Sequence, residues 1–337
     1  MKKWRVALVG AGLIGARRAR LAHEHPDSEV VSVADTDFQK ARALAAEVGA
    51  RAIEDWTEAV SDPAVNIVVV ATPTDSHAPI SLLAFKNGKH VLCEKPLARN
   101  PAEAGRMVVV AARRGLKLMT GFNHRFHPAI LKSHTLTDEG TLGKLLFARC
   151  IYGHGGREGY EKEWRVKPGV SGGGELIDQG IHALDLFRWF LGGFREVNGF
   201  VGTLFWPVRP VEDNAFALLR TRQGALAQLH ASWTQWKNRF NFEVYGEKGY
   251  IKVEGLGGSY GPESLTLGTR DKPGAVPVEH TEEFTGPDLS WAREWQEFLD
   301  ALGDDREPLG NGRDGYEALR LVQAIYKASK TRRTVRL

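Results

Sequence analysis

A glycine-rich turn near the N-terminus limits the possible folds more than any other feature of the chain. Gly10, Gly12 and Gly15 form a GxGxxG pattern between a β-rich run, Trp4–Val9, and an expected helix, Ile14–His25. The first glycine permits a tight turn, the second lets a ligand approach the backbone, and the third lets helix and strand pack closely. N–H groups at the start of the helix then favour an anion. We expect a βα unit that binds a pyrophosphate, with an ordinary ligand-free turn as the alternative.

Asp35 ends the next β-rich run, Val30–Ala34, and lies 20 residues after Gly15. A carboxylate there accepts hydrogen bonds from an adenosine ribose and repels a 2′-phosphate. The sequence therefore predicts NAD rather than NADP as the cofactor. The expected cofactor residues of this region are Gly10, Gly12, Leu13, Ile14, Gly15 and Asp35. We interpret Arg17 and Arg18 as residues of a solvated helix face, with phosphate neutralisation as the alternative.

Up to about Gly121, strand-like and helix-like segments alternate, which predicts a parallel sheet covered by helices on both faces. The expected strands are Trp4–Val9, Val30–Ala34, Val65–Ala71, His90–Cys93 and Lys117–Thr120. The expected helices are Ile14–His25, Asp37–Val48, Ser76–Asn87 and Asn100–Arg114.

Beyond Gly121, consecutive strand-like runs with short turns predict an antiparallel sheet. The expected strands are Leu145–Tyr152, Val197–Phe205, Asn214–Thr221, Ala225–Trp236 and Phe240–Gly246. The expected helices are Glu175–Leu191, Ser290–Leu302 and Asp314–Lys330.

The length of 337 residues and this change of rhythm predict two domains. We expect an α/β chain with a dinucleotide-binding, doubly wound domain over residues 1–122. An α+β domain for substrate binding and oligomerisation should cover residues 123–337, with a last helix that packs back toward the first domain.

Composition excludes several classes of protein. Lys and Arg number 45 against 41 Asp and Glu, and a net charge of +4 over this length gives little reason to expect a nucleic-acid partner. Two cysteines, Cys93 and Cys150, exclude a disulfide-framed secreted scaffold and favour a reducing cytoplasm. We expect no membrane partner, because no apolar run reaches about 18 residues, and no signal peptide is evident.

Two segments directly follow buried strand-like runs: ATPTDSH over residues 71–77 and CEKP over residues 93–96. Ligands of open α/β sheets bind outside the carboxyl ends of the strands. The adjacent charges of Glu94 and Lys95 are costly after a buried strand unless they are paired or used. A surface salt bridge is the alternative. Pro96 makes this an extended turn in which a cis peptide can occur.

The expected helix Glu175–Leu191 is apolar over much of its circumference but carries one polar stripe. Its members, spaced by three, four and three residues, are Glu175, Asp178, His182 and Asp185. Asp178 and His182 are four apart, so a carboxylate can fix the tautomer of an imidazole and raise its basicity, as a general base needs. Gly180 in mid-helix costs about 1 kcal/mol and indicates a close approach. A solvent-exposed stripe is the alternative.

Histidines and carboxylates also raise the possibility of a metal site. His124 and His127 form an HxxH pattern. No set of ligands has standard zinc spacing, and Cys93 and Cys150 stand alone, so we expect no metal.

The motifs in order are GAGLIG, Asp35, ATPTDSH, CEKPL, GFNHRF, a Trp-Arg pair followed by SGGGELIDQGIHALDL, and NGRDGYEALRLVQAIYKASK. This set resembles the glucose–fructose oxidoreductase / inositol dehydrogenase / rhizopine-catabolism (Gfo/Idh/MocA) family over nearly the whole chain. The resemblance implies a Rossmann domain, then an α/β domain on a large, mostly antiparallel, open-faced sheet. It also implies an NAD(P)-dependent oxidoreductase that acts on a hydroxyl of a sugar, cyclitol or sugar derivative.

The resemblance also implies roles for individual residues. Lys95, Asp178 and His182 match the catalytic positions, and a histidine at 182 is typical of the inositol-dehydrogenase-like branch, where other branches have tyrosine. The residues that match the nicotinamide side of the cofactor site are Thr72, Pro73, His77, Glu94, Lys95 and Asn123. Arg125, Trp164 and Arg165 match segments that face the substrate.

The glycine-rich loop Gly153–Tyr160 precedes the Trp-Arg pair and is our candidate for substrate choice. His154 and Arg157 are its expected substrate-binding residues, since an arginine can bind a carboxylate or phosphate. A mobile surface loop is the alternative. Trp233 and Trp236 could stack on a sugar ring, but we favour packing in a core or subunit interface.

We therefore expect an NAD-dependent dehydrogenase of a sugar, inositol or nucleotide-linked sugar. One alternative is an enzyme that retains NAD and achieves net epimerisation, hydrolysis or elimination by transient oxidation. The other is a nicotinamide-binding sensor without turnover, against which Lys95, Asp178 and His182 together argue. An open sheet face carrying Trp233 and Phe242 should form a homodimer or homotetramer.

Overall fold

The computed structural model describes residues 3–272 and 274–337. It divides into two compact units, one with the residues up to Phe122 together with Trp291–Leu319, the other with Asn123–Ser290 and Arg320–Leu337. The N-terminal segment of the first unit ends at Phe122, which is also the predicted domain boundary. It also includes residues 291–319, which the sequence analysis assigns to the second domain. Among the described residues, no helix is long and apolar enough to cross a membrane.

The first unit is built on a six-stranded parallel sheet with the order β3-β2-β1-β4-β5-β6. Its strands are β1 (Trp4–Val9), β2 (Ser28–Ala34), β3 (Arg51–Ile53), β4 (Ile67–Val70), β5 (His90–Glu94) and β6 (Leu118–Gly121). Every residue of β4 is buried, as expected for an apolar strand covered on both faces.

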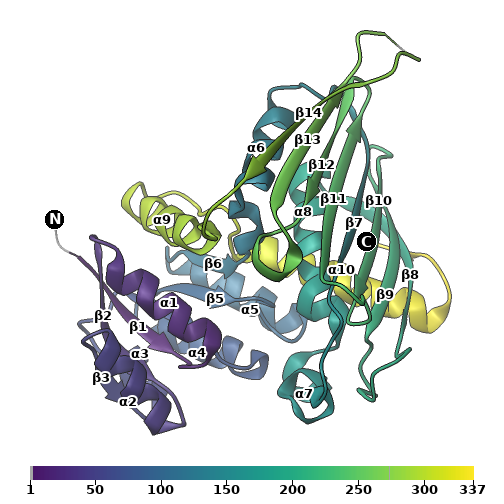
Figure 1. Cartoon of the computed structure of the whole chain (residues 1–337). Coiled ribbons are helices and arrows are strands. Elements are labelled where there is room, and N and C mark those ends of the chain that lie inside the picture. Colours follow the sequence, from purple (N-terminus) through teal and green to yellow (C-terminus); the bar gives the residue numbers. More distant parts are fainter. Residues whose placement is uncertain (1–2, 273) are drawn as a thin grey trace. The chain divides into compact units, whose positions relative to one another are not determined.

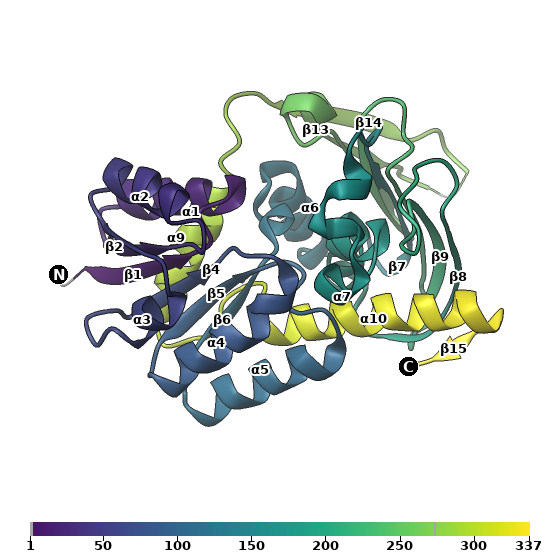
Figure 2. The same ribbon diagram turned by 90° about the horizontal axis from the view of Figure 1, so that it is seen from below.

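Helices cover both faces of this sheet (Figures 1 and 2). The helices are α1 (Leu13–Glu24), α2 (Phe38–Glu47), α3 (Trp56–Ser61), α4 (His77–Lys86), α5 (Pro101–Arg113) and α9 (Ser290–Gly303). In Figure 2, α1 and α2 lie on one side of the strands and α4 and α5 on the other. This arrangement confirms the predicted doubly wound sheet.

Residues 291–303 of α9 belong to the first unit because their apolar and charged side chains pack against α1 and β2. Trp295 is 2% exposed, and its indole N–H donates to the Ser28 hydroxyl at 3.2 Å. The Trp291 ring lies under the guanidinium of Arg18, 4.5 Å from its centroid. These contacts join residues far apart in the sequence. Local patterns therefore predicted the helix at Ser290–Leu302 but assigned it to the second domain.

The second unit contains a nine-stranded sheet with the order β14-β13-β12-β11-β7-β10-β9-β8-β15. The strands are β7 (Leu145–Gly153), β8 (Phe194–Gly202), β9 (Asn214–Thr221), β10 (Leu226–Ser232), β11 (Arg239–Gly246), β12 (Gly249–Glu254), β13 (Glu263–Thr269), β14 (Val278–Phe284) and β15 (Val335–Arg336). Neighbours are antiparallel except β7 and β10, which are parallel. The predicted mostly antiparallel sheet is confirmed.

One face of this sheet is covered by helices of the same unit (Figure 2). The helices of the unit are α6 (Pro128–Asp138), α7 (Pro168–Ser171), α8 (Ile181–Leu191) and the part of α10 (Gly312–Thr331) that begins at Arg320. Phe187 and Phe190 of α8 pack on Phe242 of β11, with ring centroids 5.9 and 5.1 Å apart. The covered face therefore holds the core.

Trp233 and Phe242 lie on the covered side, so their predicted place on an open sheet face is wrong. Both are 0% exposed. Trp233 directly follows the last residue of β10. It lies in a buried core cluster with Tyr160, and the two ring centroids are 5.0 Å apart. Trp236, in contrast, is 96% exposed.

The opposite face of the sheet carries exposed apolar side chains. Phe216 and Leu218 alternate with buried residues along β9, and Phe216 pairs in register with Phe200 of β8. Phe200, Phe216 and Leu218 are 67%, 47% and 63% exposed. An exposed cluster of this kind indicates a surface that another molecule covers.

Candidate active site

The glycine loop takes the shape that a bound pyrophosphate requires. Gly10 has a positive φ of 100°, and a Cβ there would lie 2.5 Å from the carbonyl oxygen of Ala71. A Cβ on Gly15 would lie 1.8 Å from the carbonyl oxygen of Gly10. Gly12 differs, since a Cβ there would meet nothing within 4 Å. Gly10 and Gly15 are thus required by close backbone packing, whereas a side chain at Gly12 would point into open space.

The surroundings of Gly12 fit a dinucleotide. Gly12 is the N-cap of α1, where no side chain caps the helix and no acidic residue stands in the first turn. Leu13 beside it is 85% exposed, while Ile14 is half-buried. At the end of β4, the Thr72 hydroxyl oxygen is buried and has no hydrogen-bond partner among the described residues. An uncapped helix start and an orphaned hydroxyl are what a phosphate-bearing ligand would satisfy.

Asp35 shapes this loop through both carboxylate oxygens. One oxygen accepts the Ala11 N–H at 2.7 Å, and the other accepts the N–H of Asp37 at 2.8 Å. Asp35 therefore holds the glycine loop against the end of β2, and its half-buried carboxylate remains at the position where a ribose hydroxyl is expected.

His77 ties together the two loops that follow β4 and β5. Its ring nitrogens lie 2.9 Å from the carbonyl oxygens of Pro96 and Thr72. The side chain is 1% exposed, and burial lowers the pKa of the imidazole. We assign His77 to holding these loops, in place of the predicted cofactor contact. Thr72 and the exposed Pro73 remain in the loop that it fixes.

Glu94 and Arg18 form a buried ion pair behind the loop that carries Lys95. Nε of Arg18 donates to one Glu94 oxygen at 2.8 Å, and Nη2 lies 2.7 Å from the same oxygen. Nη1 lies 2.5 Å from a carboxylate oxygen of Glu294. Arg18 is 2% exposed, so its predicted place on a solvated helix face is wrong; α9 covers it. Arg17 does lie exposed. Glu94 is therefore paired rather than free for a ligand.

Lys95 itself follows β5 directly and is half-buried. The peptide that joins it to Pro96 is cis. Leu97 and Thr120 close the same turn from behind, because a Cβ on Gly315 would lie 3.0 Å from Leu97 and 2.4 Å from the Thr120 hydroxyl. Leu97, two residues after Lys95, therefore packs closely against Gly315.

In the second unit, two of the three glycines before the polar helix lie directly against other groups of the chain. A Cβ on Gly173 would lie 2.1 Å from the Tyr326 hydroxyl, and a Cβ on Gly174 would lie 2.1 Å from the Glu212 carbonyl oxygen. Gly172 has a φ of 87°, which favours glycine. No side chain other than hydrogen fits at Gly173 or Gly174 without displacing these groups.

Glu212 binds the start of the helix with its carboxylate. It accepts the N–H groups of Gly174 at 3.2 Å and Leu176 at 3.0 Å, and the Tyr326 hydroxyl at 2.8 Å. Glu212 is 6% exposed, and burial raises the pKa of its carboxyl. Sequence reasoning missed Glu212 and Tyr326. The available signal was the adjacent acids Glu212 and Asp213 before the strand at Asn214, because buried neighbouring charges are costly unless they are paired.

The expected continuous helix is in fact two pieces. Residues Leu176–Gly180 form a π-helical turn, η5, which continues into α8 at Ile181. A Cβ on Gly180 would lie 3.1 Å from both Ala231 and Leu176, so the predicted close approach at this glycine is confirmed. The turn therefore packs against Ala231 of β10 at Gly180, and π-turns of this kind recur at functional sites.

His182 is buried, at 4% exposed, and its ring stacks on His124 with centroids 3.8 Å apart. The Asp178 side chain is 19% exposed, and its carboxylate lies 3.6 Å from Nε of Arg165. Glu175 and Asp185 are also buried, at 0% and 1%. A solvent-exposed stripe is therefore excluded, and these groups face protein.

Asn123 and Arg125 lie in the short helix η2 (Asn123–Phe126). The Arg125 guanidinium is 2% exposed and donates to both Asp185 oxygens, at 2.6 and 2.7 Å. This bidentate pair anchors α8, so we assign Arg125 a structural role in place of the predicted substrate contact. Asn123 is buried and donates to the Ser290 hydroxyl at 3.1 Å.

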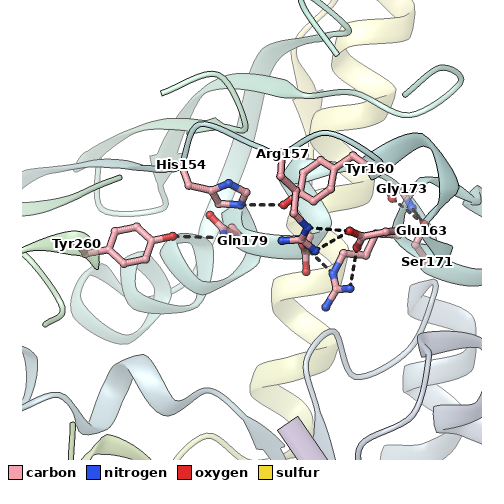
Figure 3. A network of polar contacts seen from close by, with 10 residues as sticks. His154, Arg157, Tyr160, Glu163, Ser171, Gly173, Gln179 and Tyr260 are labelled. Atoms are coloured by element: carbon pink, nitrogen blue, oxygen red, sulfur yellow. Dashed lines mark hydrogen bonds and ion pairs between the residues drawn. The ribbon is translucent and has the colours of Figure 1, made fainter. Parts of the chain in front are cut away.

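The loop after β7 forms a polar network (Figure 3). Arg165, which follows this loop, lies 3.6 Å from Asp178. His154 Nδ1 accepts the Gly156 N–H at 3.0 Å, so the neutral ring carries its proton on Nε2, which lies 3.3 Å from the Tyr160 hydroxyl. Burial lowers the pKa of His154. Arg165 lies over the ring of Trp164, 4.7 Å from its centroid. The loop residues predicted to choose substrate are thus gathered in one place.

Within residues 3–272 and 274–337, no group of three or more His, Cys, Asp or Glu side chains is placed to hold a metal ion. His127 of the HxxH pattern instead lies 2.9 Å from Glu263 of β13.

Comparison with known families decides what kind of protein this is. Residues 4–122 match the model described as "Oxidoreductase family, NAD-binding Rossmann fold", and residues 130–252 match the Gfo/Idh/MocA C-terminal domain. The chain belongs to the Gfo/Idh/MocA family. It is accordingly an oxidoreductase whose first unit is an NAD-binding Rossmann domain.

Named members of the Gfo/Idh/MocA family match along nearly the whole chain. The 1,5-anhydro-D-fructose reductase of Ensifer adhaerens is 28% identical over 98% of this chain and 97% of its own. An inositol 2-dehydrogenase of Rubrobacter xylanophilus is 27% identical, over 95% and 89%. Among solved structures, the aldose-aldose oxidoreductase of Caulobacter crescentus, complexed with glycerol, has a TM-score of 0.87, 27% identity and complete coverage of both chains.

Proposed function

We propose that this member of the family is an NAD-dependent dehydrogenase acting on a CH–OH group of a sugar, an inositol or a sugar derivative. The observation that carries the proposal is the buried His182 imidazole near the carboxylate-bearing turn of Asp178, in a chain whose other unit fits NAD. Sugar and inositol enzymes among its relatives support the same substrate class. The half-buried Lys95 supplies the third group that such a reaction needs.

Each residue of the trio has a distinct task in this proposal. Bound NAD supplies the hydride acceptor. His182 removes the hydroxyl proton, because an imidazole is the side chain that most often serves as a general base near neutral pH. Asp178 orients the imidazole and balances its positive charge once it is protonated. Lys95 stabilises the negative charge that develops on the substrate oxygen. The exchanged assignment, with Lys95 as base and His182 as a positioning group, is the alternative.

A panel of sugars and cyclitols with NAD, followed by NADH absorbance, tests the proposal. Lys95→Ala and His182→Ala should each lower kcat by at least about 100-fold, the loss typical of an acid–base group. Asp178→Asn should lower kcat as well. The NAD dissociation constant should change little, because the glycine loop and Asp35 are intact in all three variants. Near wild-type turnover by both the Lys95 and His182 variants would overturn this assignment.

A second candidate is an enzyme that keeps NAD bound and reoxidises it within each cycle. The Caulobacter relative is named for a reaction between two aldoses, which favours keeping this candidate. Sugar conversion without accumulation of NADH, together with NAD that copurifies, would distinguish it from the dehydrogenase.

We also propose that the exposed apolar face of the sheet joins copies of this chain into a homodimer or homotetramer. Phe200, Phe216 and Leu218 support this proposal in place of Trp233 and Phe242, which are buried. Light scattering of wild type and Leu218→Glu tests it: the wild type should be oligomeric and the variant of lower mass. A monomeric wild type at micromolar concentration would refute it.

Buried thiols at Cys93 and Cys150 are consistent with the proposed cytoplasmic location.

A further inference from the structure

Two arginines of the loop after β7 converge on one carboxylate, that of Glu163. Arg157 donates to one Glu163 oxygen from Nε at 2.9 Å and Nη2 at 2.6 Å. Arg165 reaches the other oxygen from Nη1 at 3.3 Å. Figure 3 shows Glu163 at the centre of this set. Glu163 lies between the short helices η3 (Tyr160–Lys162) and η4 (Trp164–Val166), which fix its backbone.

This ion-pair network adjoins the proposed catalytic carboxylate. Nε of Arg165 lies 3.6 Å from Asp178, so Arg165 stands between Glu163 and Asp178. The formal charges of the two arginines and the two carboxylates cancel. Arg157 also lies over the ring of Tyr160, 4.6 Å from the ring centroid, which holds the guanidinium in place. These four side chains are therefore polar, and their formal charges balance.

Arginine forks bind carboxylates and phosphates through paired N–H groups. Here a carboxylate of the chain already takes these donors, and its negative charge would repel a second anion. A sugar hydroxyl needs no such displacement, because it can hydrogen-bond to the edges of the same groups. The network thus favours uncharged ligands over anionic ones of similar shape.

We infer that Glu163 is a specificity-determining residue that restricts the site to uncharged polyols and disfavours sugar carboxylates. This inference rests on the proposed function and narrows its substrate class. It also assigns the predicted substrate residues Arg157 and Arg165 a different use: they are neutralised by Glu163 rather than offered to an anionic substrate. Removal of the Glu163 charge should then create an anion site.

The experiment uses the full chain with NAD as wild type, Glu163→Gln, Glu163→Asp and Glu161→Gln. Glu161 is an exposed carboxylate two residues earlier, so its variant removes the same charge without touching the network. Binding of D-glucuronate and of D-glucose is measured by calorimetry, and turnover of both sugars by NADH absorbance. Glu163→Gln should bind glucuronate at least about tenfold more tightly than wild type and Glu161→Gln do, while Glu163→Asp keeps the wild-type preference.

Glucuronate affinity that is unchanged or weaker in Glu163→Gln would overturn the inference, as would a wild type that prefers glucuronate to glucose. The second result would mean that Glu163 presents the arginines to an anion. Because calorimetry reads binding without turnover, the inference can hold or fail even if wild type produces no NADH from any sugar. The absence of NADH would count against the proposed function alone.

Discussion

Two helices of this chain begin at a glycine-rich turn, and the two turns use their glycines differently. At the start of α1, a Cβ on Gly12 would point into open space, and no side chain caps the helix. Before η5, a Cβ on Gly173 or Gly174 would collide with Tyr326 or Glu212. The first turn leaves its N–H groups for an external anion, whereas the second satisfies them with the internal carboxylate of Glu212.

The two turns show that a glycine-rich motif before a helix can have two different causes. A glycine can be required because a ligand must approach the backbone or because another part of the chain already does. In the first turn a mutation should change cofactor affinity, and in the second it should change folding and turnover. The four predictions below test this division, from the largest expected effect to the smallest.

Gly174→Ala should be the most damaging change. Its Cβ would lie 2.1 Å from the Glu212 carbonyl oxygen, so the turn must open and lose its hydrogen bonds. We expect the free energy of unfolding to fall by about 3 kcal/mol, measured by urea denaturation. Gly193→Ala is the control, since a Cβ there meets nothing within 4 Å. Equal stabilities of the two variants would show that the second turn is as open as the first.

Glu212→Gln should cost about 2 kcal/mol of stability, because an amide replaces the carboxylate that accepts three donors. The kcat should fall while the NAD dissociation constant stays the same, since the glycine loop of α1 is untouched. Steady-state kinetics and NAD titration by fluorescence measure the two quantities. A variant that loses NAD affinity as strongly as kcat would break the division between the turns.

Gly12→Ala should give the opposite result. Gly12 has a φ of −74°, which alanine adopts, and its Cβ has room, so stability should change by less than about 0.5 kcal/mol. The added methyl takes space that the pyrophosphate needs, and we expect NAD to bind about tenfold more weakly. Unchanged NAD affinity would mean that the dinucleotide does not approach Gly12.

Asp35→Ser with Thr36→Arg complements this test, because it should shift the cofactor preference toward NADP. Tighter binding of NADP than of NAD by the wild type would contradict the role of Asp35.

The smallest effect concerns pH. Burial raises the pKa of the Glu212 carboxyl, so this group contributes stability below its ordinary value of 4.5, and that contribution is lost as pH rises through the raised value. The Tyr326 hydroxyl lowers the pKa of Glu212, and Tyr326→Phe should raise it further. The stability difference between wild type and Tyr326→Phe should therefore grow by about 1 kcal/mol from pH 5 to pH 8. In a Glu212→Gln background this growth should vanish; its persistence would assign it to another group.

Local patterns predicted the first unit well, because each βα unit there is built from neighbours in sequence. The β4 strand, the helix after Asp37 and the cap at Asn100 all follow from short-range rules, and Asn100 does accept the Glu103 N–H at 3.0 Å. The short α3 and β3 were missed, since three to six residues give no period to detect. The strand β8 begins at Phe194, three residues before its predicted start.

The site was harder to predict where it depends on distant partners. Asp178, His182 and Lys95 stay predicted site residues, which their spacing or their position at a strand end singles out. The roles of Arg18 and Arg125 were misjudged, because the carboxylates that bury them lie 76 and 60 residues away. In the sequence, Glu163 does not differ from other polar loop residues. In the structure, its carboxylate forms ion pairs with two arginines, Arg157 and Arg165. No periodic pattern encodes such convergence.

The π-helical turn at Leu176–Gly180 has a consequence for how this helix can change over time. A π-turn holds one residue more than the α-helical turn it replaces, and each residue of an α-helix accounts for about 100° of rotation. Loss of a single residue from the turn would restore an α-helical turn. Side chains within the turn, including that of Asp178, would then point in new directions, while α8 and His182 kept their place. The direction of the Asp178 side chain can therefore change in evolution without a change in the position of the His182 imidazole. The gain or loss of one codon within the π-helical turn would be enough.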